Sequence, residues 1–481
     1  MSKKALNKKN LVALGADRLA DLCLELGEGS SEIKRRLRLE LTHAAGPEAL
    51  AHEVRKRIAT IRRSTSYVEW NRIRPLVRDL DTQLTMIADK IAPGAPDTAF
   101  DLLWQFIELA PSVYERTDDS NGGIGAVFSH ALTRFEDLTP HIQPNQRVLA
   151  ERIFASMSNK GYGEWDGLLE YVGSALKPEG IAALKEAVDA YEAAPLPEDT
   201  MKSRAVFAGS GRVGYSLDRD WPAKRKADEI RRWRQEIADL EGDVDAYLSQ
   251  FDVERLENPA FAAAAATRLI AAGRAAEALP ILETARDKAG KRFIPHAWNE
   301  AYVNALTALD RKEELHAFRW QIFSETLAPD YLRDLLKALP DFDDIEMEEK
   351  AKDLAFRHRD FEAALGFFLD WPDLKLAADL IAARVDELDG DAYHALTPAA
   401  EALQHEHPLA ATLCRRAMIR YTLDKAKSTR YKHAIRHFAE CASADGDIDS
   451  YGRFIDHESF ATELKTKHPR KLGFWSGVES G

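Results

Sequence analysis

Two histidines near the C-terminus have the spacing of a helical metal site. His433 and His437 are four residues apart, so they would share one face of a helix, and Glu440 follows three residues later. Two imidazoles and a carboxylate can hold zinc. Ala434 stands beside His433, so the pattern lacks the general base of a His-Glu-x-x-His site. The other neighbours are Lys and Arg, which repel a metal cation. We therefore predict solvent-facing or packing histidines, and no metal.

Residues 209–214 spell Gly-Ser-Gly-Arg-Val-Gly, which matches the letters of a dinucleotide-binding loop. That chemistry requires a strand before the loop and a helix after it, whose N-terminal amides hold the pyrophosphate. Here the approach is rich in proline, and helical periodicity does not resume until after Pro222. We therefore predict a flexible loop and no nucleotide cofactor.

The acidic stretch Asp118–Gly123 suggests a calcium loop. An EF-hand needs oxygen ligands at positions 1, 3 and 5 and a bidentate Glu at position 12. Counted from Asp119, position 5 is Gly123 and position 12 is His130, so both fail. The better interpretation is a turn in which Asp119, Ser120 or Asn121 caps a helix that begins near residue 124.

Charge is distributed unevenly along the chain. Residues 1–63 contain 14 Lys/Arg and 8 Asp/Glu, whereas the whole chain has a net charge of −13. Further basic residues, with aromatic residues among them, lie within 425–436 and 465–475. Such segments can bind phosphates, but the acidic remainder opposes strong affinity for nucleic acid.

The familiar catalytic signatures are absent from the sequence. It contains no nucleophile elbow, Walker loop, kinase set or paired-carboxylate signature. Catalytic groups scattered along a chain can still assemble in space. No catalytic or cofactor-binding residue is predicted, and an enzyme of unknown reaction type stays an alternative.

The elements that would position these residues are helices almost throughout. Apolar residues recur at helical spacing at Ile33, Leu37 and Leu41, and again from Phe100 to Ile107. Alternating strand patterns are scarce. The short intervening loops predict antiparallel neighbouring helices.

One pattern occurs three times, in residues 273–282, 359–368 and 429–438. Counted from each first residue, small and apolar side chains return at offsets 5, 6 and 9. They are Ala278, Leu279 and Leu282, then Ala364, Leu365 and Phe368, then Ala434, Ile435 and Phe438. The small Ala lets a neighbouring helix approach closely, and each interval leaves room for two helical hairpins. The pattern predicts an all-α solenoid of stacked antiparallel hairpins, tetratricopeptide-like in its C-terminal half.

The strongest break in periodicity divides the chain. Residues 195–222 are rich in Pro, Gly and Ser, and helical spacing resumes at 223. We predict an N-terminal helical domain over 1–194, a linker or exposed loop over 195–222, and a C-terminal repeat domain over 223–481. The alternative is one continuous superhelix with an inserted loop.

Bulk composition fits a protein with a core and no disulfide framework. Of 481 residues, 45% are hydrophobic and 30% are charged, and the three cysteines are scattered. Cys23 lies among leucines at helical spacing and is predicted to be a small core residue. No apolar run is long enough to span a bilayer, and the charged start is not a signal peptide. We predict a cytoplasmic protein without membrane contact.

Several segments carry a family resemblance. They are residues 114–125, 161–169, 241–247, 428–438, 456–460 and 468–475. Through them the chain resembles a family of bacterial helical-repeat proteins of unknown function, related to helical regions that accompany SWIM-type zinc fingers. The resemblance implies helical-repeat architecture and no particular activity. The Cys-x-Cys and Cys-x-His spacing of the finger itself is absent, so zinc-finger function is not implied.

A repeat architecture favours binding over catalysis, because stacked hairpins form grooves that accept helices or extended peptides. We predict a non-catalytic scaffold that binds a protein or peptide partner. A nucleic-acid-associated protein that uses its basic terminal segments is the alternative, and nucleic acid is not the expected partner.

Overall fold

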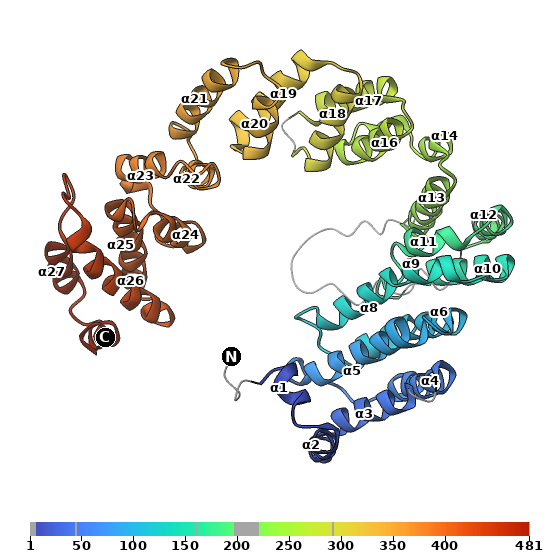
Figure 1. The fold of residues 1–481 in the computed structure, drawn as a ribbon. Coiled ribbons are helices and arrows are strands. Elements are labelled where there is room, and N and C mark those ends of the chain that lie inside the picture. The colour runs from blue at the N-terminus through green and yellow to red at the C-terminus, as the bar shows by residue number, and fades with distance from the viewer. Residues whose placement is uncertain (1–5, 44–45, 160, 197–220, 291–292, 481) are drawn as a thin grey trace, which may run out of the picture. The chain divides into compact units, whose positions relative to one another are not determined.

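The computed structural model describes residues 6–43, 46–159, 161–196, 221–290 and 293–480. Within these ranges the chain is helical and forms no β-strand, and one isolated bridge pairs Val68 with Thr117. Contacts divide the chain into two compact units, Met1–Leu256 (unit 1) and Glu257–Gly481 (unit 2). Figure 1 shows the helices of each unit packed side by side, largely in the order of the chain.

Unit 1 contains fifteen α-helices among its described residues, together with short 3₁₀ turns and one π-helix. They are α1 (Lys8–Val12), α2 (Ala16–Glu28), α3 (Ser31–His43), α4 (Pro47–Arg63), η1 (Trp70–Arg72), α5 (Arg74–Thr85), the π-helix η2 (Met86–Ile91), α6 (Pro96–Ile107), α7 (Ala110–Tyr114), α8 (Gly123–Thr133), α9 (Phe135–Leu138), η3 (Thr139–His141), α10 (Gln146–Met157), α11 (Leu168–Val172), η4 (Gly173–Ala175), α12 (Pro178–Ala193), α13 (Trp221–Glu241), α14 (Val244–Leu248) and α15 (Val253–Leu256).

Unit 2 has the same helical character in the part that the structure describes. Its elements are α16 (Pro259–Ala271), α17 (Ala275–Ala289), α18 (His296–Ala308), α19 (Lys312–Thr326), α20 (Pro329–Leu336), α21 (Asp343–Phe356), α22 (Phe361–Asp370), α23 (Leu374–Ala383), η6 (Val385–Glu387), α24 (Tyr393–Leu403), α25 (Pro408–Asp424), η7 (Ser428–Arg430), α26 (Tyr431–Ala444), η8 (Asp445–Asp447), α27 (His457–Lys467) and α28 (Leu472–Ser480).

Proline and aspartate fix many of the helix starts. Pro47 and Pro408 occupy the first turn of α4 and α25, where a missing N–H costs nothing. Asp360 and Asp456 cap α22 and α27, and their carboxylates accept backbone N–H bonds from residues 363 and 459 at 3.1 and 2.7 Å. The sequence therefore contains local signals that define where these helices begin.

The three repeated segments lie on helices α17, α22 and α26. Ala278, Ala364 and Ala434 are each at most 1% exposed, as predicted, and these helices contact their neighbours α16 and α18, α23 and α24, and α25 and α28. Their apolar companions are also buried, except Ile435, which is half-buried. The second interval holds helices α22 to α25, for which two hairpins leave room. The first interval holds α17 to α21 among the described residues, which is one helix more than two hairpins.

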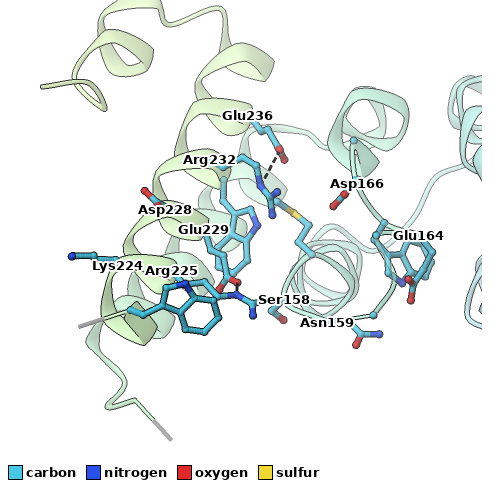
Figure 2. Close-up of a pocket in the computed structure, with 17 residues that line it drawn as sticks. Ser158, Asn159, Glu164, Asp166, Lys224, Arg225, Asp228, Glu229, Arg232 and Glu236 are labelled. Carbon is cyan, nitrogen blue, oxygen red and sulfur yellow. Dashed lines mark hydrogen bonds and ion pairs between the residues drawn. The ribbon is translucent and has the colours of Figure 1, made fainter. Parts of the chain in front are cut away.

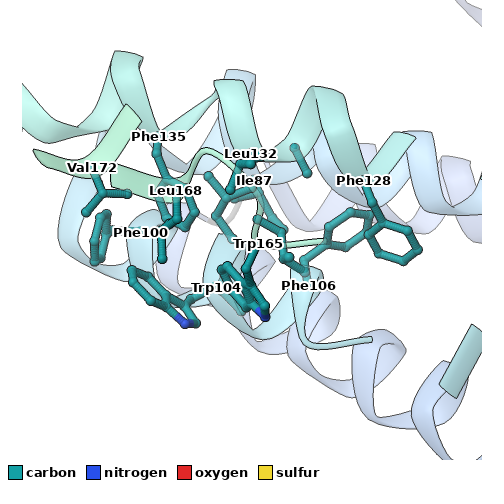
Figure 3. Packing of buried hydrophobic residues seen from close by; sticks show 14 of the residues in the cluster. Ile87, Phe100, Trp104, Phe106, Phe128, Leu132, Phe135, Trp165, Leu168 and Val172 are labelled. Carbon is teal, nitrogen blue, oxygen red and sulfur yellow. The ribbon is translucent and has the colours of Figure 1, made fainter. Parts of the chain in front are cut away.

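The core of unit 1 is a continuous apolar cluster that extends from α3 to α13. Figure 3 shows its aromatic centre, where Phe100 and Trp104 of α6 meet Phe135 of α9 at ring distances of 5.1 and 5.2 Å. Residues 100–107 therefore form the buried helical face that their spacing predicts. At its edge α3 buries Leu39, whereas Leu41 is exposed, so the expected face of that helix was wrong.

The division into units differs from the predicted domain boundary at 195–222. Helix α13 follows that segment, yet it packs on α11 and α12 and contributes Ile230, Trp233 and Ile237 to the core of unit 1. The contacts therefore end unit 1 at Leu256. Most of the predicted linker, residues 197–220, lies outside the described residues.

None of the described helices is both long enough and apolar enough to cross a bilayer. Three free cysteines are present: Cys414 and Cys441 are buried, and Cys23 is half-buried at the periphery of unit 1.

Candidate functional site

A short glycine-containing loop between α10 and α11 is anchored in the core of unit 1. Trp165 is 6% exposed and its ring lies 5.2 Å from that of Trp104. The indole Nε1 of Trp104 in turn donates a 3.1 Å hydrogen bond to Oγ of Ser156 on α10. Trp165 lies beside Trp104 in the core (Figure 3), and this contact anchors the backbone that carries Glu164 and Asp166.

Glycines let this loop fold back on itself. Gly163 and Gly167 have φ values of +87° and +82°, which lie in the left-handed region that residues other than glycine rarely adopt. A Cβ at Gly161 would overlap the carboxylate of Glu164. Glu164 Oε2 accepts a 2.6 Å hydrogen bond from the backbone N–H of Tyr162. The carboxylate is therefore turned toward its own loop.

Glu164 is unusual because it is buried and only half satisfied. The residue is 8% exposed, and its Oε1 has no hydrogen-bond partner. Among the residues that the structure describes, no Lys, Arg or His lies within ion-pair distance of it. A buried carboxylate normally has a cationic or hydrogen-bonding partner on each oxygen. Oε1 is thus a buried acceptor to which none of the described residues donates.

The segment that joins α7 to α8 lies close to this loop, because Tyr114 and Tyr162 are in ring contact. Asp119 accepts backbone N–H bonds from Ile124 at 3.0 Å and Gly125 at 2.9 Å, which confirms the predicted cap of α8. The bridge between Val68 and Thr117 holds the chain just before this cap. Burial, followed by the charges of Asp119 and Glu164, raises the pKa of Tyr114.

A wide cleft of about 860 Å³ opens between this loop and the first turns of α13. Figure 2 shows Glu164, Asp166 and Asn159 on one side and the charged side chains of α13 on the other. The lining side chains with charge are Glu164, Asp166, Lys224, Arg225, Asp228, Glu229, Arg232 and Glu236. Carboxylates outnumber cations among these described residues.

The charges of α13 are largely organised within that helix. Arg225 Nε donates a 2.9 Å bond to Glu229, and Asp228 pairs with Arg231 and Arg255. Glu236 is different, because its closest cation, Arg232, is 3.9 Å away. Burial raises the pKa of Glu236 to about 7. The positive charge of Arg232 lowers this pKa, whereas the nearby carboxylates of Asp166 and Asp239 raise it further.

A smaller cavity of about 320 Å³ shares Gly163, Glu164 and Asp166 with the cleft. Its other walls are aromatic and hydroxylic. They comprise Tyr114, Gly125, Phe128, Ser129, Leu132, Thr133, Tyr162 and Tyr171. We call it the tyrosine cavity. Among the described residues that line it, none carries a positive charge.

The structure does not bring the predicted histidines together. His433 is exposed on α26, whereas His437 is 6% exposed and its Nδ1 lies 3.1 Å from Glu440 Oε2. That oxygen also receives Arg415 Nε at 2.9 Å. Burial lowers the pKa of His437. In the described part of the chain, no three His, Cys, Asp or Glu side chains lie together as a metal site.

Two further sequence motifs remain, the dinucleotide-like loop and the calcium-like loop. Residues 209–214, the dinucleotide-like loop, lie outside the described residues. The segment from Asp118 to Gly123 forms the cap of α8, and its Asp118 accepts a bond from the backbone N–H of Ser120 at 3.2 Å. That is an Asx turn, and its carboxylates are engaged by the chain itself.

The family model for a family of unknown function, DUF6880, matches residues 1–477. The chain belongs to the DUF6880 family. No curated protein matches it. The sequence segments 114–125 and 161–169, which carried the resemblance, meet in space in this DUF6880 chain, since they supply most of the walls of the tyrosine cavity.

Sequence reasoning missed both the cleft and the cavity. Glu164 and Asp166 lie in the loop before α11 whereas Glu236 lies on α13, and their spacing matches no known motif. The available signal was the glycine pattern 161, 163 and 167 around a tryptophan, which indicates a tight loop with a buried anchor.

Proposed function

We propose that this chain is a non-catalytic scaffold that binds a protein partner through a peptide segment seated in the cleft of unit 1. The observation that carries the proposal is the cleft itself, which at about 860 Å³ is large and offers charges of both signs along α13. Apolar small-molecule sites differ from it, because they are mostly hydrophobic with few polar groups.

A helical-repeat arrangement of unit 2 forms part of the proposal. The main contacts in this unit join helices that are consecutive or next but one along the chain, for example α16 with α17 and α18, and α24 with α25. Such near-neighbour packing is typical of solenoids, and it supports the tetratricopeptide-like stacking expected from the repeated segments. The likeness to helical regions that accompany SWIM-type zinc fingers belongs here too, and concerns architecture alone.

One observation favours an enzyme as the alternative. A carboxyl with a pKa of about 7, as at Glu236, suits a general acid or base. The described residues that line the cleft include no Cys or His, and no metal-type cluster accompanies Glu236 among them. Binding therefore has more support than catalysis.

Another observation favours the nucleic-acid alternative. A recess of about 240 Å³ in unit 1 is lined by Arg35, Arg38, Lys56 and Arg57 together with Glu53. Arg35 and Arg57 already hold the buried Asp79, so two of the four cations are committed to the fold. Binding to random oligonucleotides that weakens steeply with salt would favour this alternative.

A peptide selection tests the proposed function. The full chain is used to select from a random dodecapeptide library, and the winners are titrated by fluorescence polarisation. We expect Arg232→Ala, in the cleft, to weaken them at least tenfold. The matched control is Arg147→Ala on α10, whose side chain is 70% exposed and does not line the cleft. Equal binding by both variants would contradict the proposal.

A further inference from the structure

The tyrosine cavity has the composition of a receptor for a positive charge. Tyr114 and Tyr162 present their rings side by side, with centroids 5.1 Å apart, and Tyr171 adds a third. Aromatic faces carry negative electrostatic potential and attract ammonium and guanidinium groups. Tyr162 is 60% exposed, so its ring stands at the entrance.

Carboxylates supply the charge that would complete such a receptor. Glu164 and Asp166 line the cavity, and Asp119 lies close enough to Tyr114 to raise its pKa. These acids do not cluster tightly enough to hold a metal ion. An organic cation, which spreads its charge over several donors, suits carboxylates that stand apart.

The unsatisfied oxygen of Glu164 also indicates a ligand, apart from the composition of the cavity. It belongs to a side chain that is more than nine-tenths buried, it lacks any partner, and its residue lines both the cavity and the cleft. An occupant without a donor would leave this carboxylate oxygen unpaired, and an anionic occupant would be repelled, and both are costly inside a protein. A cationic donor removes that cost.

We propose that the tyrosine cavity binds the arginine or lysine side chain of the peptide whose backbone lies in the cleft. The inference rests on the proposed function. The cation lies against the exposed edge of the Tyr114–Tyr162 ring pair and donates to the Glu164 carboxylate. The rest of the peptide continues toward α13 past Gly163 and Asp166, which line both the cavity and the cleft.

Blocked pentapeptides test the charge requirement. The probes are Ac-Gly-Gly-X-Gly-Gly-amide with X as arginine, lysine or citrulline, titrated calorimetrically into the full chain. Citrulline has nearly the shape of arginine without its charge. We expect the arginine and lysine probes to bind at least tenfold more tightly than the citrulline probe. Equal affinities would overturn the proposal.

Two variants locate the effect. Glu164→Gln keeps an oxygen that can accept from the Tyr162 N–H, so the loop should fold, and it should lower arginine-probe affinity to the citrulline level. Glu170→Gln is the matched control, since it removes the same charge from an exposed residue that lines neither space. Tyr162→Ala removes an exposed ring, and should weaken the arginine probe about threefold to tenfold. Retention of the arginine preference by Glu164→Gln would overturn the assignment.

Different results would contradict the cation-binding cavity and the peptide-binding function. If selected library peptides depend on Arg232 but show no enrichment in arginine or lysine, the cavity assignment is wrong and the peptide-binding function stands. If N-acetyl-arginine-amide binds in a Glu164-dependent manner while the library gives no binders, the peptide source is wrong and the proposed function fails with it.

Discussion

The carboxylate of Glu164 occupies the space beside Cα of Gly161 where a side chain would begin. The two residues are therefore coupled, although one has no side chain. Glycine is needed at 161 to let the acid turn back onto its own loop, and in this position Glu164 also lines the tyrosine cavity.

Gly161→Ala should separate stability from binding. The obstructing group is the end of a flexible side chain, so it can move aside, and we expect a cost below about 1 kcal/mol. The arginine probe should nevertheless lose most of its advantage over citrulline. Thermal melts and the same calorimetric titrations measure both effects. Gly446→Ala, where an added Cβ meets nothing, is the control, and an unchanged arginine preference in Gly161→Ala would refute the coupling.

Ser156→Ala should destabilise unit 1 by about 1–3 kcal/mol, because it leaves the buried indole N–H of Trp104 without an acceptor. Urea unfolding of the full chain, followed by tryptophan fluorescence, measures the change. Ser174→Ala provides a comparison, since that exposed hydroxyl meets only Thr139. A Ser156→Ala midpoint equal to that of the parent chain would show that the hydrogen bond contributes nothing.

Ala364→Leu should overpack α22 and cost about 1–3 kcal/mol, because the methyl group is fully buried against neighbouring helices. The exposed Ala439 on α26 serves as a matched site, where Ala→Leu should stay within about 0.5 kcal/mol. Melting temperatures distinguish them. If Ala364→Leu melts like the parent, the repeat register is wrong.

Stability should fall as pH rises toward 7, and Glu236 should account for part of that fall. Its pKa is raised from 4.5 to about 7 in the folded state, so between these values the folded protein binds more protons than the unfolded chain. The slope of stability against pH is therefore negative in this window and levels off above it. The side chain is 31% exposed, and solvent screening limits the effect to about 1–2 kcal/mol.

Denaturant midpoints at pH 5, 6, 7 and 8 measure this dependence. We expect Glu236→Gln to flatten the fall, because the amide does not titrate. Glu254→Gln, an exposed acid on α15, should leave it intact. A Glu236→Gln curve parallel to that of the parent would count against the raised pKa.

Exhaustive chelation should leave helix content and melting temperature unchanged. Glu440 is already bonded to His437 and Arg415, and His433 is exposed, so these residues present no vacant ligand set. Circular dichroism before and after chelator treatment provides the measurement. Loss of helicity that zinc restores would promote His433 and His437 to ligands.

Periodicity predicts the parts of this molecule that depend on local sequence. Phe100 to Ile107, the alanines of the repeated segments, and Ile230 to Ile237 are buried where their spacing places them. Spacing fails at α3, where a short charged helix at the edge of the unit buries Leu39 and exposes Leu41. A helix at the edge of a unit has neighbouring helices on one side, and their positions decide which of its faces is buried.

The candidate site depends on contacts that spacing does not encode. Asp119 could be predicted as a cap because its partners are five and six residues away. Glu164 could not be predicted as a buried acid, since its burial depends on Trp165 packing against Trp104, which is 61 residues distant in the chain. Likewise, α13 joins unit 1 through packing on α12, across the segment where composition suggested a boundary.

The near-neighbour packing of unit 2 has a consequence for biosynthesis. Since α16 meets α17 and α18, and α24 meets α25, each helix can find its partners soon after it leaves the ribosome. Chains dominated by such short-range contacts fold quickly, and stretches made first need not wait for the last. A stalled or truncated product of this gene should therefore already contain folded helices, and release from the ribosome should not be the step that starts folding.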